Sequence, residues 1–207
     1  MTASGTPSIL AEEADPGRAR AGKRLPRDFY ARPTLRVARD LLGKVLALET
    51  AASTKTARIV EGEAYLGGRD PASHAYRGLT PRTAPMFGPP GRSYVYFVYG
   101  MYHCLNVVTE SDGVAGAVLL RGAEPLAGFE DLDPRSLAGP GKLARAFGLT
   151  TEHTNLDLVR SILTVRDAPR VATSRVVRSA RVGLNEHATT DKPWRLYVRG
   201  SSGVSRP

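Results

Sequence analysis

The chain has 207 residues, of which 42% are hydrophobic, so it can form one sizeable domain with a tail. Lysine and arginine number 29 against 20 aspartates and glutamates, which gives a net charge of +9 and a pI near 10.0. Such a charge favours a polyanionic partner, most often nucleic acid, with a basic protein that binds no polyanion as the alternative.

The single cysteine, Cys104, excludes an intrachain disulfide and a paired-cysteine zinc site. It fits a reduced, cytosolic setting. His74, His103 and Cys104 do not have the spacing of zinc ligands, so we expect no bound metal. No apolar run approaches the roughly 20 residues of a membrane-spanning helix, and the N-terminus lacks the apolar centre of a signal peptide. We therefore expect no membrane association.

The first residues are small and polar, with clustered charges and no helical or strand period. This pattern predicts a disordered basic arm over residues 1–25 and a single domain over residues 26–207. Pro33 and an apolar stripe then predict a helix that ends at Gly43. The stripe consists of Leu35, Ala38, Leu41 and Leu42.

Residues 44–50 and 57–65 are predicted to form an antiparallel strand pair, with a turn at residues 51–56. Residues 67–92 are rich in glycine and proline but carry apolar and aromatic side chains, which predicts a long ordered loop region. Loops of this length in compact domains usually serve function.

Residues 125–137 are predicted to be short helix and loop, residues 139–149 a helix that Gly148 ends, and residues 156–165 either strand or helix. Further strands are predicted at residues 93–99, 104–109, 116–121, 175–184 and 194–199, the first two joined by a tight turn at GMYH. The whole predicts an α+β fold: a single domain with a curved antiparallel β-sheet, surrounding helices and a protruding β-hairpin.

One strand carries a candidate catalytic acid. Because side chains alternate between the faces of a strand, Glu63 and Tyr65 point the same way. Gly62, on the other face, lets a neighbour approach the backbone closely. The alternative is that Glu61 and Glu63 form a solvated strand face, since glutamate is rarely buried. The neighbouring tyrosine and the glycine-rich loop favour a functional site.

The tyrosines of the next strand divide into two groups. Tyr94 and Tyr96 share one face, whereas Tyr99 has the opposite parity and lies at the hairpin tip. An exposed aromatic side chain on a basic protein can stack between bases or wedge a duplex open. The alternative is that all of them are sheet or core aromatics, which strands favour. We assign Tyr94 to packing and His74 to ring stacking or hydrogen bonding.

Three basic residues are candidates for contacts with DNA phosphates. Arg77 and Arg82 lie in the long loop, and Lys142 lies at the start of the predicted helix 139–149. The segment GPGK lacks the full phosphate-loop pattern GxxxxGK[ST]. A helix N-terminus with a lysine can nevertheless hold one phosphate.

Eight segments occur in a characteristic order: RIVEGEAYLG, DPASH, TPR…MFGPPG, YVYFVYGMYHCLN, LLRGAEP, PGKLARAF, ARVGL and LYVRGS. In this order and spacing, over about residues 26–205, the chain resembles the alkyladenine (3-methyladenine) DNA glycosylases. The resemblance implies a monofunctional, monomeric base-excision-repair enzyme without a cofactor, acting on double-stranded DNA in the cytoplasm, at the nucleoid if the source is bacterial. Such an enzyme flips a damaged purine out of the duplex and hydrolyses its N-glycosidic bond.

The resemblance also implies roles for catalytic residues. Glu63 matches the general base that activates water, and Arg121 and the backbone carbonyl of Val182 match the groups that help to hold that water. His103 departs from the aromatic residue that relatives carry, which leaves groove contacts open but not the catalytic roles.

Further roles concern the flipped base and the duplex. Tyr65, His74 and Tyr96 match the residues that sandwich the base. Asn106 matches the residue that obstructs the amino group of normal guanine, and Tyr99 the one that intercalates into the vacated stack.

The chemistry agrees with one catalytic carboxylate. An alkylated purine is cationic and leaves readily, so one acid can both activate water and stabilise the oxocarbenium-like sugar. Lesions of the 3-methyladenine, 7-methylguanine, hypoxanthine and ethenoadenine class all fit. Two alternatives are a non-catalytic damaged-DNA-binding module and a hydrolase of free nucleosides, and the second conflicts with the +9 charge.

Overall fold

The computed structural model describes residues 22–206, apart from residue 131 and residues 185–190. Most of the arm predicted over residues 1–25 therefore lies outside the described residues. The end of that range belongs to the folded body, because Arg24 forms a β-bridge with Arg166 and Leu25 is buried.

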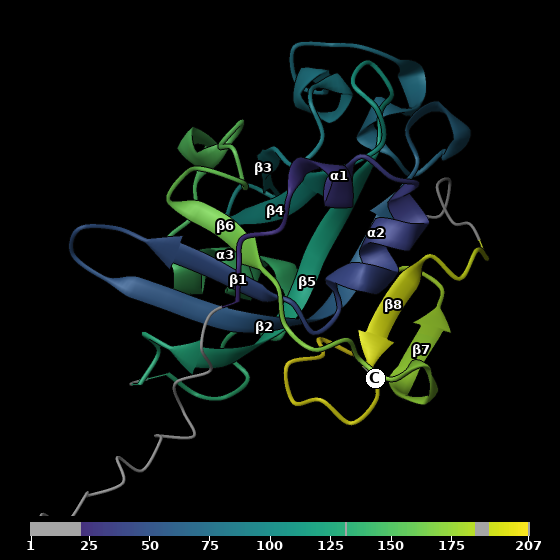
Figure 1. Ribbon diagram of the computed structural model, residues 1–207. Helices are drawn as coiled ribbons and strands as arrows, with labels where there is room; N and C mark the ends of the chain where they lie inside the picture. The colour runs from purple at the N-terminus through teal and green to yellow at the C-terminus, as the bar shows by residue number, and fades with distance from the viewer. Residues whose placement is uncertain (1–21, 131, 185–190, 207) are drawn as a thin grey trace, which may run out of the picture.

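Short helices surround a single sheet (Figure 1). The α-helices are α1 (Arg27–Tyr30), α2 (Thr34–Leu41) and α3 (Pro140–Phe147), and five short segments of the described chain form 3₁₀-helices. The strands are β1 (Val45–Glu49), β2 (Thr54–Tyr65), β3 (Ser93–Val98), β4 (Tyr102–Val108), β5 (Ala117–Ala127), β6 (Leu163–Arg166), β7 (Val176–Ser179) and β8 (Arg195–Val198). Within the described part of the chain, no helix is long and apolar enough to cross a membrane.

The sheet is antiparallel and β2 is its central strand. Six strands follow the order β3-β4-β5-β2-β1-β6, while β8 pairs with β2 and β7 with β8. β5 pairs along one edge of β2, and β1 and then β8 pair along the other. Register shifts between Ile59 and Glu61, and between Glu61 and Gly62, mark bulges that bend the strand. Glu61 and Glu63 thus lie inside the curved sheet, and the predicted α+β fold is confirmed.

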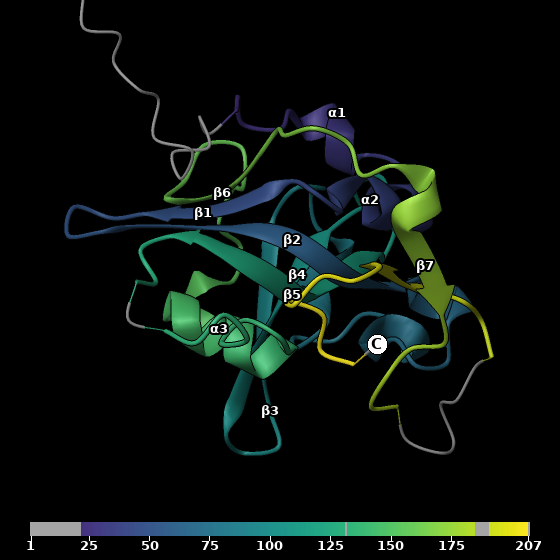
Figure 2. The same cartoon turned by 90° about the horizontal axis from the view of Figure 1, so that it is seen from below.

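Apolar side chains pack on both faces of the sheet. Figure 2 shows α1 and α2 on the side opposite to the β3–β4 hairpin, and α3 beside that hairpin. The core includes Leu41 of α2, Ile59 of β2, Leu120 of β5 and Phe147 of α3, each at most 2% exposed. Their burial drives the folding of the domain.

Four predicted boundaries are wrong. The strand predicted over residues 175–184 ends at Ser179. β2 begins at Thr54 and takes in residues assigned to the turn at 51–56, because its pairing with β1 reaches that far. β5 continues to Ala127, and no helix occurs among the described residues of 125–137, because the pairing of β5 with β2 displaces it. In the range 156–165, only the end belongs to a strand, β6.

The hairpin turn lies earlier than GMYH predicts. It spans Val98 to Met101, closed by the Met101 N–H, which donates to the Val98 carbonyl at 3.3 Å. Tyr99 and Gly100 both have positive φ, 55° and 67°, as in the type I′ turn that suits tight hairpins. Tyr102 therefore belongs to β4, where its ring packs on Gly141 of α3. The hairpin projects from the body of the molecule (Figure 2).

Gly122 of β5 has no room for a side chain. A Cβ at this position would overlap the carbonyl oxygen of Gly203 and lie 3.1 Å from Glu61 Oε2. We expect Gly122→Ala to lower the free energy of unfolding by about 1–3 kcal/mol, as overpacking does. Gly68→Ala is the control, because the nearest atom would be 4.0 Å away. Urea denaturation measures both, and equal stabilities would contradict the expected crowding at Gly122.

Candidate functional site

The Glu63 carboxylate is fully buried and held by three groups. Its Oε1 accepts a hydrogen bond from the Val182 N–H at 2.7 Å, and its Oε2 accepts one from the Tyr65 hydroxyl at 2.9 Å. Arg121 Nη1 lies 3.4 Å from the same Oε2. Glu63 and Glu61 are both 0% exposed, so the solvated-face alternative is wrong. The reason is tertiary: Val182, from the segment after β7, lies against Glu63, and Ser205, from the segment after β8, lies against Glu61.

The surroundings of Glu63 act on its pKa in opposite directions. Burial raises the pKa because it disfavours the charged carboxylate, and this effect is the largest. The positive charge of Arg121, the Val182 N–H and the Tyr65 hydroxyl favour the charged form and offset part of it. A carboxylate with a raised pKa is a stronger base than an exposed one, provided it stays ionised at the working pH.

Arg121 links Glu63 to a backbone carbonyl. Its Nη1 donates to the Val182 carbonyl at 3.3 Å while it lies beside Glu63. The structure therefore brings Glu63, Arg121 and Val182 together from three segments that are far apart in the sequence. A carboxylate, a guanidinium and a carbonyl oxygen supply the acceptors and the donor needed to orient one water molecule.

A cavity of about 330 Å³ adjoins this group, within the roughly 300–1,000 Å³ typical of small-ligand pockets. Glu63 is not part of its wall, but Tyr65 is, and the Tyr65 hydroxyl connects the wall to the carboxylate. The wall includes Tyr65, His74, Met86, Tyr94, Tyr96, Tyr99, Asn106 and Gly183. All five residues predicted to contact a base or a base stack therefore share one cavity.

His74 and Tyr96 form one continuous wall. Their ring centroids are 4.6 Å apart at an interplanar angle of 74°, which leaves no room for a base between them. Tyr94 continues the wall, with its ring centroid 5.5 Å from that of Tyr96. A flat ring in the cavity would therefore lie between this wall and Tyr65.

Tyr94 does more than the packing predicted for it. It is 3% exposed and belongs to a buried apolar cluster with Met86. Its hydroxyl also lies 3.2 Å from His74 Nδ1, within hydrogen-bonding distance. The signal in the sequence for this contact with His74 was that Tyr94 and Tyr96 lie on the same face of their strand. Because only the fold brings the loop carrying His74 against β3, the hydrogen bond itself was not predictable.

The surroundings of His74 favour its neutral form. Partial desolvation against the wall lowers its pKa although the side chain is still exposed at the surface, and the charge of nearby Arg82 lowers the pKa further. A neutral imidazole does not repel a cationic ring, whereas a protonated one would. Arg82, a predicted phosphate contact, is thus close to the aromatic wall.

Asn106 and Tyr99 occupy different ends of the cavity. Asn106 is 4% exposed, and its Nδ2 donates to the Tyr94 carbonyl at 3.1 Å. Tyr99 is 76% exposed yet still lines the cavity at its mouth. Tyr99 thus lines the cavity although its strand parity differs from that of Tyr94 and Tyr96.

A buried ion pair behind Tyr65 was missed in the sequence. Arg181 donates to both oxygens of Asp70 at 2.6 and 2.7 Å, and to the Ala64 carbonyl at 2.9 Å. Its guanidinium lies 4.5 Å from the centroid of the Tyr65 ring. Since Arg181 is not among the residues of the cavity wall, it covers the face of Tyr65 that is turned away from the cavity. It therefore fixes the ring from behind.

Comparison with known proteins identifies the family. The family model described as "Methylpurine-DNA glycosylase (MPG)" matches residues 28–202. The chain belongs to the methylpurine-DNA glycosylase family. It is 48% identical to a protein of Myxococcus xanthus over 88% of this chain and 93% of that one. For proteins of Methanocella arvoryzae and Anaeromyxobacter dehalogenans strain 2CP-1, the identities are 47% over 88% and 96%, and 51% over 89% and 86%. Each is named "Putative 3-methyladenine DNA glycosylase".

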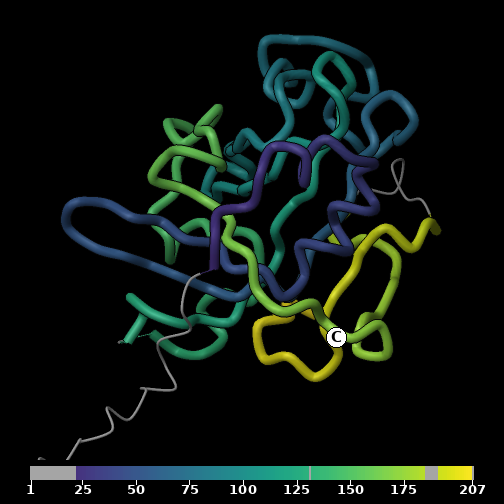
Figure 3. Tube along the Cα trace, in the orientation of Figure 1, coloured from purple at the N-terminus to yellow at the C-terminus, as the bar shows by residue number. Residues whose placement is uncertain are grey.

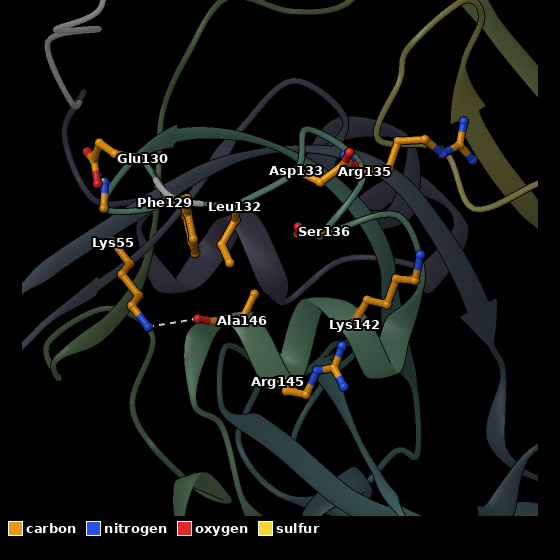
Figure 4. A pocket seen from close by; sticks show the side chains of 11 residues that line it. Lys55, Phe129, Glu130, Leu132, Asp133, Arg135, Ser136, Lys142, Arg145 and Ala146 are labelled. Carbon is orange, nitrogen blue, oxygen red and sulfur yellow. Dashed lines mark hydrogen bonds between the residues drawn. The ribbon is translucent and has the colours of Figure 1, made fainter.

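The basic candidates of this DNA glycosylase lie outside the cavity wall. Arg77 and Arg82 are exposed on the long loop, and Lys142 is exposed on α3. Figure 4 shows Lys142 and Arg145 at a second hollow, between α3 and the segment after β5. There Lys55 Nζ donates to the Ala146 carbonyl at 2.7 Å, near the end of α3. In the described residues, no cluster of three or more histidine, cysteine or acidic side chains is placed to hold a metal ion.

The raised pKa of Glu63 predicts a pH-dependent effect on stability. Below its ordinary pKa of 4.5, this carboxyl is protonated in both the folded and the unfolded chain, and its contribution to stability is fully present. As the pH rises through the raised pKa of the folded chain, the buried group ionises and that contribution is lost. We therefore expect Glu63→Gln, which is neutral throughout, to be more stable than the wild type near neutral pH. This gain should shrink towards about pH 4. Urea denaturation at both pH values measures it, and a gain independent of pH would count against the raised pKa.

Proposed function

We propose that this chain is a monofunctional DNA glycosylase that excises alkylated or deaminated purines with a water molecule activated by Glu63. The observation that carries the proposal is the position of Glu63, buried beside Arg121 and Val182 and joined by the Tyr65 hydroxyl to an aromatic cavity. The substrate class is that of 3-methyladenine, 7-methylguanine, hypoxanthine and ethenoadenine in duplex DNA. The enzyme acts as a monomer, and a cytoplasmic or nucleoid location stays a prediction.

Recognition begins when the target nucleotide leaves the duplex. Damaged or mispaired bases cost less to unstack, which is one source of selectivity. Tyr99 at the projecting tip fills the vacated space, because its 76% exposed ring lies at the mouth of the cavity. The base then enters between Tyr65 and the wall of His74 and Tyr96.

The aromatic faces favour a cationic purine. Cation–π attraction contributes about 0.5–2 kcal/mol when the cation is desolvated. His74 does not repel the cationic purine, because its lowered pKa favours the neutral imidazole. Asn106 lies at the buried end of the cavity, where it obstructs the exocyclic amino group of a normal guanine.

Hydrolysis breaks the bond between C1′ and the purine nitrogen and forms a bond between C1′ and the water oxygen. Arg121 Nη1 and the Val182 carbonyl hold the water, and Glu63 accepts its proton as it attacks. The negative carboxylate also stabilises the oxocarbenium-like sugar. The bonding electrons leave with the purine. A purine that is cationic through N-alkylation accepts these electrons without being protonated. A neutral lesion such as hypoxanthine needs a proton on leaving, so we expect it to be excised more slowly.

The second candidate is a damaged-DNA-binding module without catalysis. The aromatic cavity favours this candidate, because such a cavity suits the binding of a base without any chemistry. The buried carboxylate argues against it, because a binding module gains nothing from an acid whose burial costs free energy. A test that measures base release and DNA binding separately decides between the two candidate functions.

We expect Glu63→Gln to reduce base release by at least about 10²-fold, because the glutamine cannot accept the proton of the water. Binding of a lesion-containing duplex should stay within about threefold of the wild type, since the side chain keeps its shape. Single-turnover release of free base, measured for each lesion, and fluorescence anisotropy report the two quantities. Normal release by Glu63→Gln would refute the mechanism, and no release by the wild type from any lesion would favour the binding module.

Tyr99→Ala tests the intercalating role. We expect affinity for a lesion duplex to fall by about tenfold or more, because loss of base stacking is worth ~1–3 kcal/mol. Affinity for undamaged duplex should change much less, since phosphate contacts dominate it and give it a steep salt dependence. Titrations at several salt concentrations measure both. Equal losses for the two duplexes would mean that Tyr99 does not fill the stack.

A further inference from the structure

β2 carries a second buried carboxylate that the proposed reaction does not use. Glu61 is 0% exposed and accepts four hydrogen bonds. Arg121 Nε donates to its Oε1 at 3.2 Å, and Arg195 Nε donates to the same oxygen at 2.7 Å. Ser205 donates its hydroxyl to Oε1 at 2.9 Å and its backbone N–H to Oε2 at 2.6 Å. A carboxylate with this many donors is held firmly in one orientation.

Glu61 meets the catalytic group through Arg121. The guanidinium uses Nε for Glu61, while Nη1 contacts the Val182 carbonyl and lies beside Glu63. Because a guanidinium is planar and rigid, fixing Nε also fixes the direction of Nη1. With Arg195, the group contains two carboxylates and two guanidiniums, so its charges balance inside the sheet.

The segment after β8 completes this group. It is yellow in Figure 3 and folds back beside β2 and β5. Val204 is 4% exposed and belongs to the main core, which anchors the segment. A side chain on Gly203 would overlap the Ala123 carbonyl, so the backbones are in close contact. The family match ends at residue 202, whereas the contacts to Glu61 come from Ser205.

We propose that Glu61 and Ser205 are positioning residues, which hold Arg121 in the orientation that places water against Glu63. The Ser205 hydroxyl links both partners. It donates a hydrogen bond to Glu61 and accepts one from Arg121 Nη2 at 3.5 Å. The inference rests on the proposed function, since it assigns Arg121 to the water. Loss of the Ser205 hydroxyl should therefore slow the chemical step and leave binding of lesion DNA unchanged.

The other explanation is that Ser205 only helps to attach the segment after β8 to the sheet. The chain offers a matched control, because Ser201 in the same segment donates its hydroxyl to Glu124 Oε1 at 2.6 Å. This contact attaches the segment to β5 without touching Glu61 or Arg121. Ser201→Ala and Ser205→Ala each remove one serine–glutamate hydrogen bond, and only the second reaches Arg121.

The first experiment compares Ser205→Ala, Ser205→Thr and Ser201→Ala in the full chain by single-turnover base release and by binding of the same lesion duplex. We expect Ser205→Ala to slow release by about tenfold, the value of one hydrogen bond to a charged group, with an unchanged Kd. Ser205→Thr keeps the hydroxyl and should retain the rate, as should Ser201→Ala. Equal losses for Ser205→Ala and Ser201→Ala, or an unchanged rate for Ser205→Ala, would overturn the proposal.

A second measurement does not depend on activity. In the wild type, the Nε–H of Arg121 should be protected from solvent exchange, and ¹⁵N NMR detects it. We expect Ser205→Ala and Glu61→Gln to speed that exchange by about tenfold, and Ser201→Ala to leave it unchanged. Unchanged protection in Ser205→Ala would refute the positioning role even if the chain released no base. If only the proposed function is wrong, the wild type will release no base, but the Nε–H of Arg121 will still exchange in the wild type and the variants as expected above.

Discussion

The burial of the Glu63 carboxylate beside Arg121 is the interaction on which the rest of the site depends. A charged carboxylate inside a sheet costs several kcal/mol unless charges and hydrogen bonds offset the loss of water. Val182 and Ser205, from the segments after β7 and β8, lie against the two carboxylates, while β5 and β8 pair with the two edges of β2. The same two strands supply Arg121 and Arg195, so the sheet that buries the acids also provides their counter-charges.

A second constraint is the placement of aromatic rings around a space that must stay open. Tyr65 is fixed from behind by Arg181, and Tyr96 by the strand pairing of the hairpin. His74 comes from a loop and depends on Tyr94 and Tyr96 for its position. Rigid strands thus orient Tyr65 and Tyr96, and the loop region adds His74 to the wall that Tyr96 begins, which is the usual division between scaffold and site.

Stability and function compete within this arrangement. The raised pKa of Glu63 means that its ionised form opposes folding, yet the ionised form is the one that can take a proton from water. Asp70 with Arg181, and Glu61 with Arg195 and Ser205, hold the neighbouring groups rigidly and so limit the reorganisation that the reaction requires. A site built in this way gains orientation from charge pairs that a simple apolar core would not need.

Strand parity and the order of the motifs can be read directly along the chain, so they were sufficient to predict the sheet class, the shared direction of Glu63 and Tyr65, and the family. The sequence did not determine that Glu63 is buried, since burial depends on distant segments that pack against the carboxylate. Nor could it give the pairs Asp70–Arg181 and Glu61–Ser205, whose members lie 111 and 144 residues apart. Both pairs arise from the folded chain, because long-range pairing is set by the topology of the whole sheet and no local pattern encodes it.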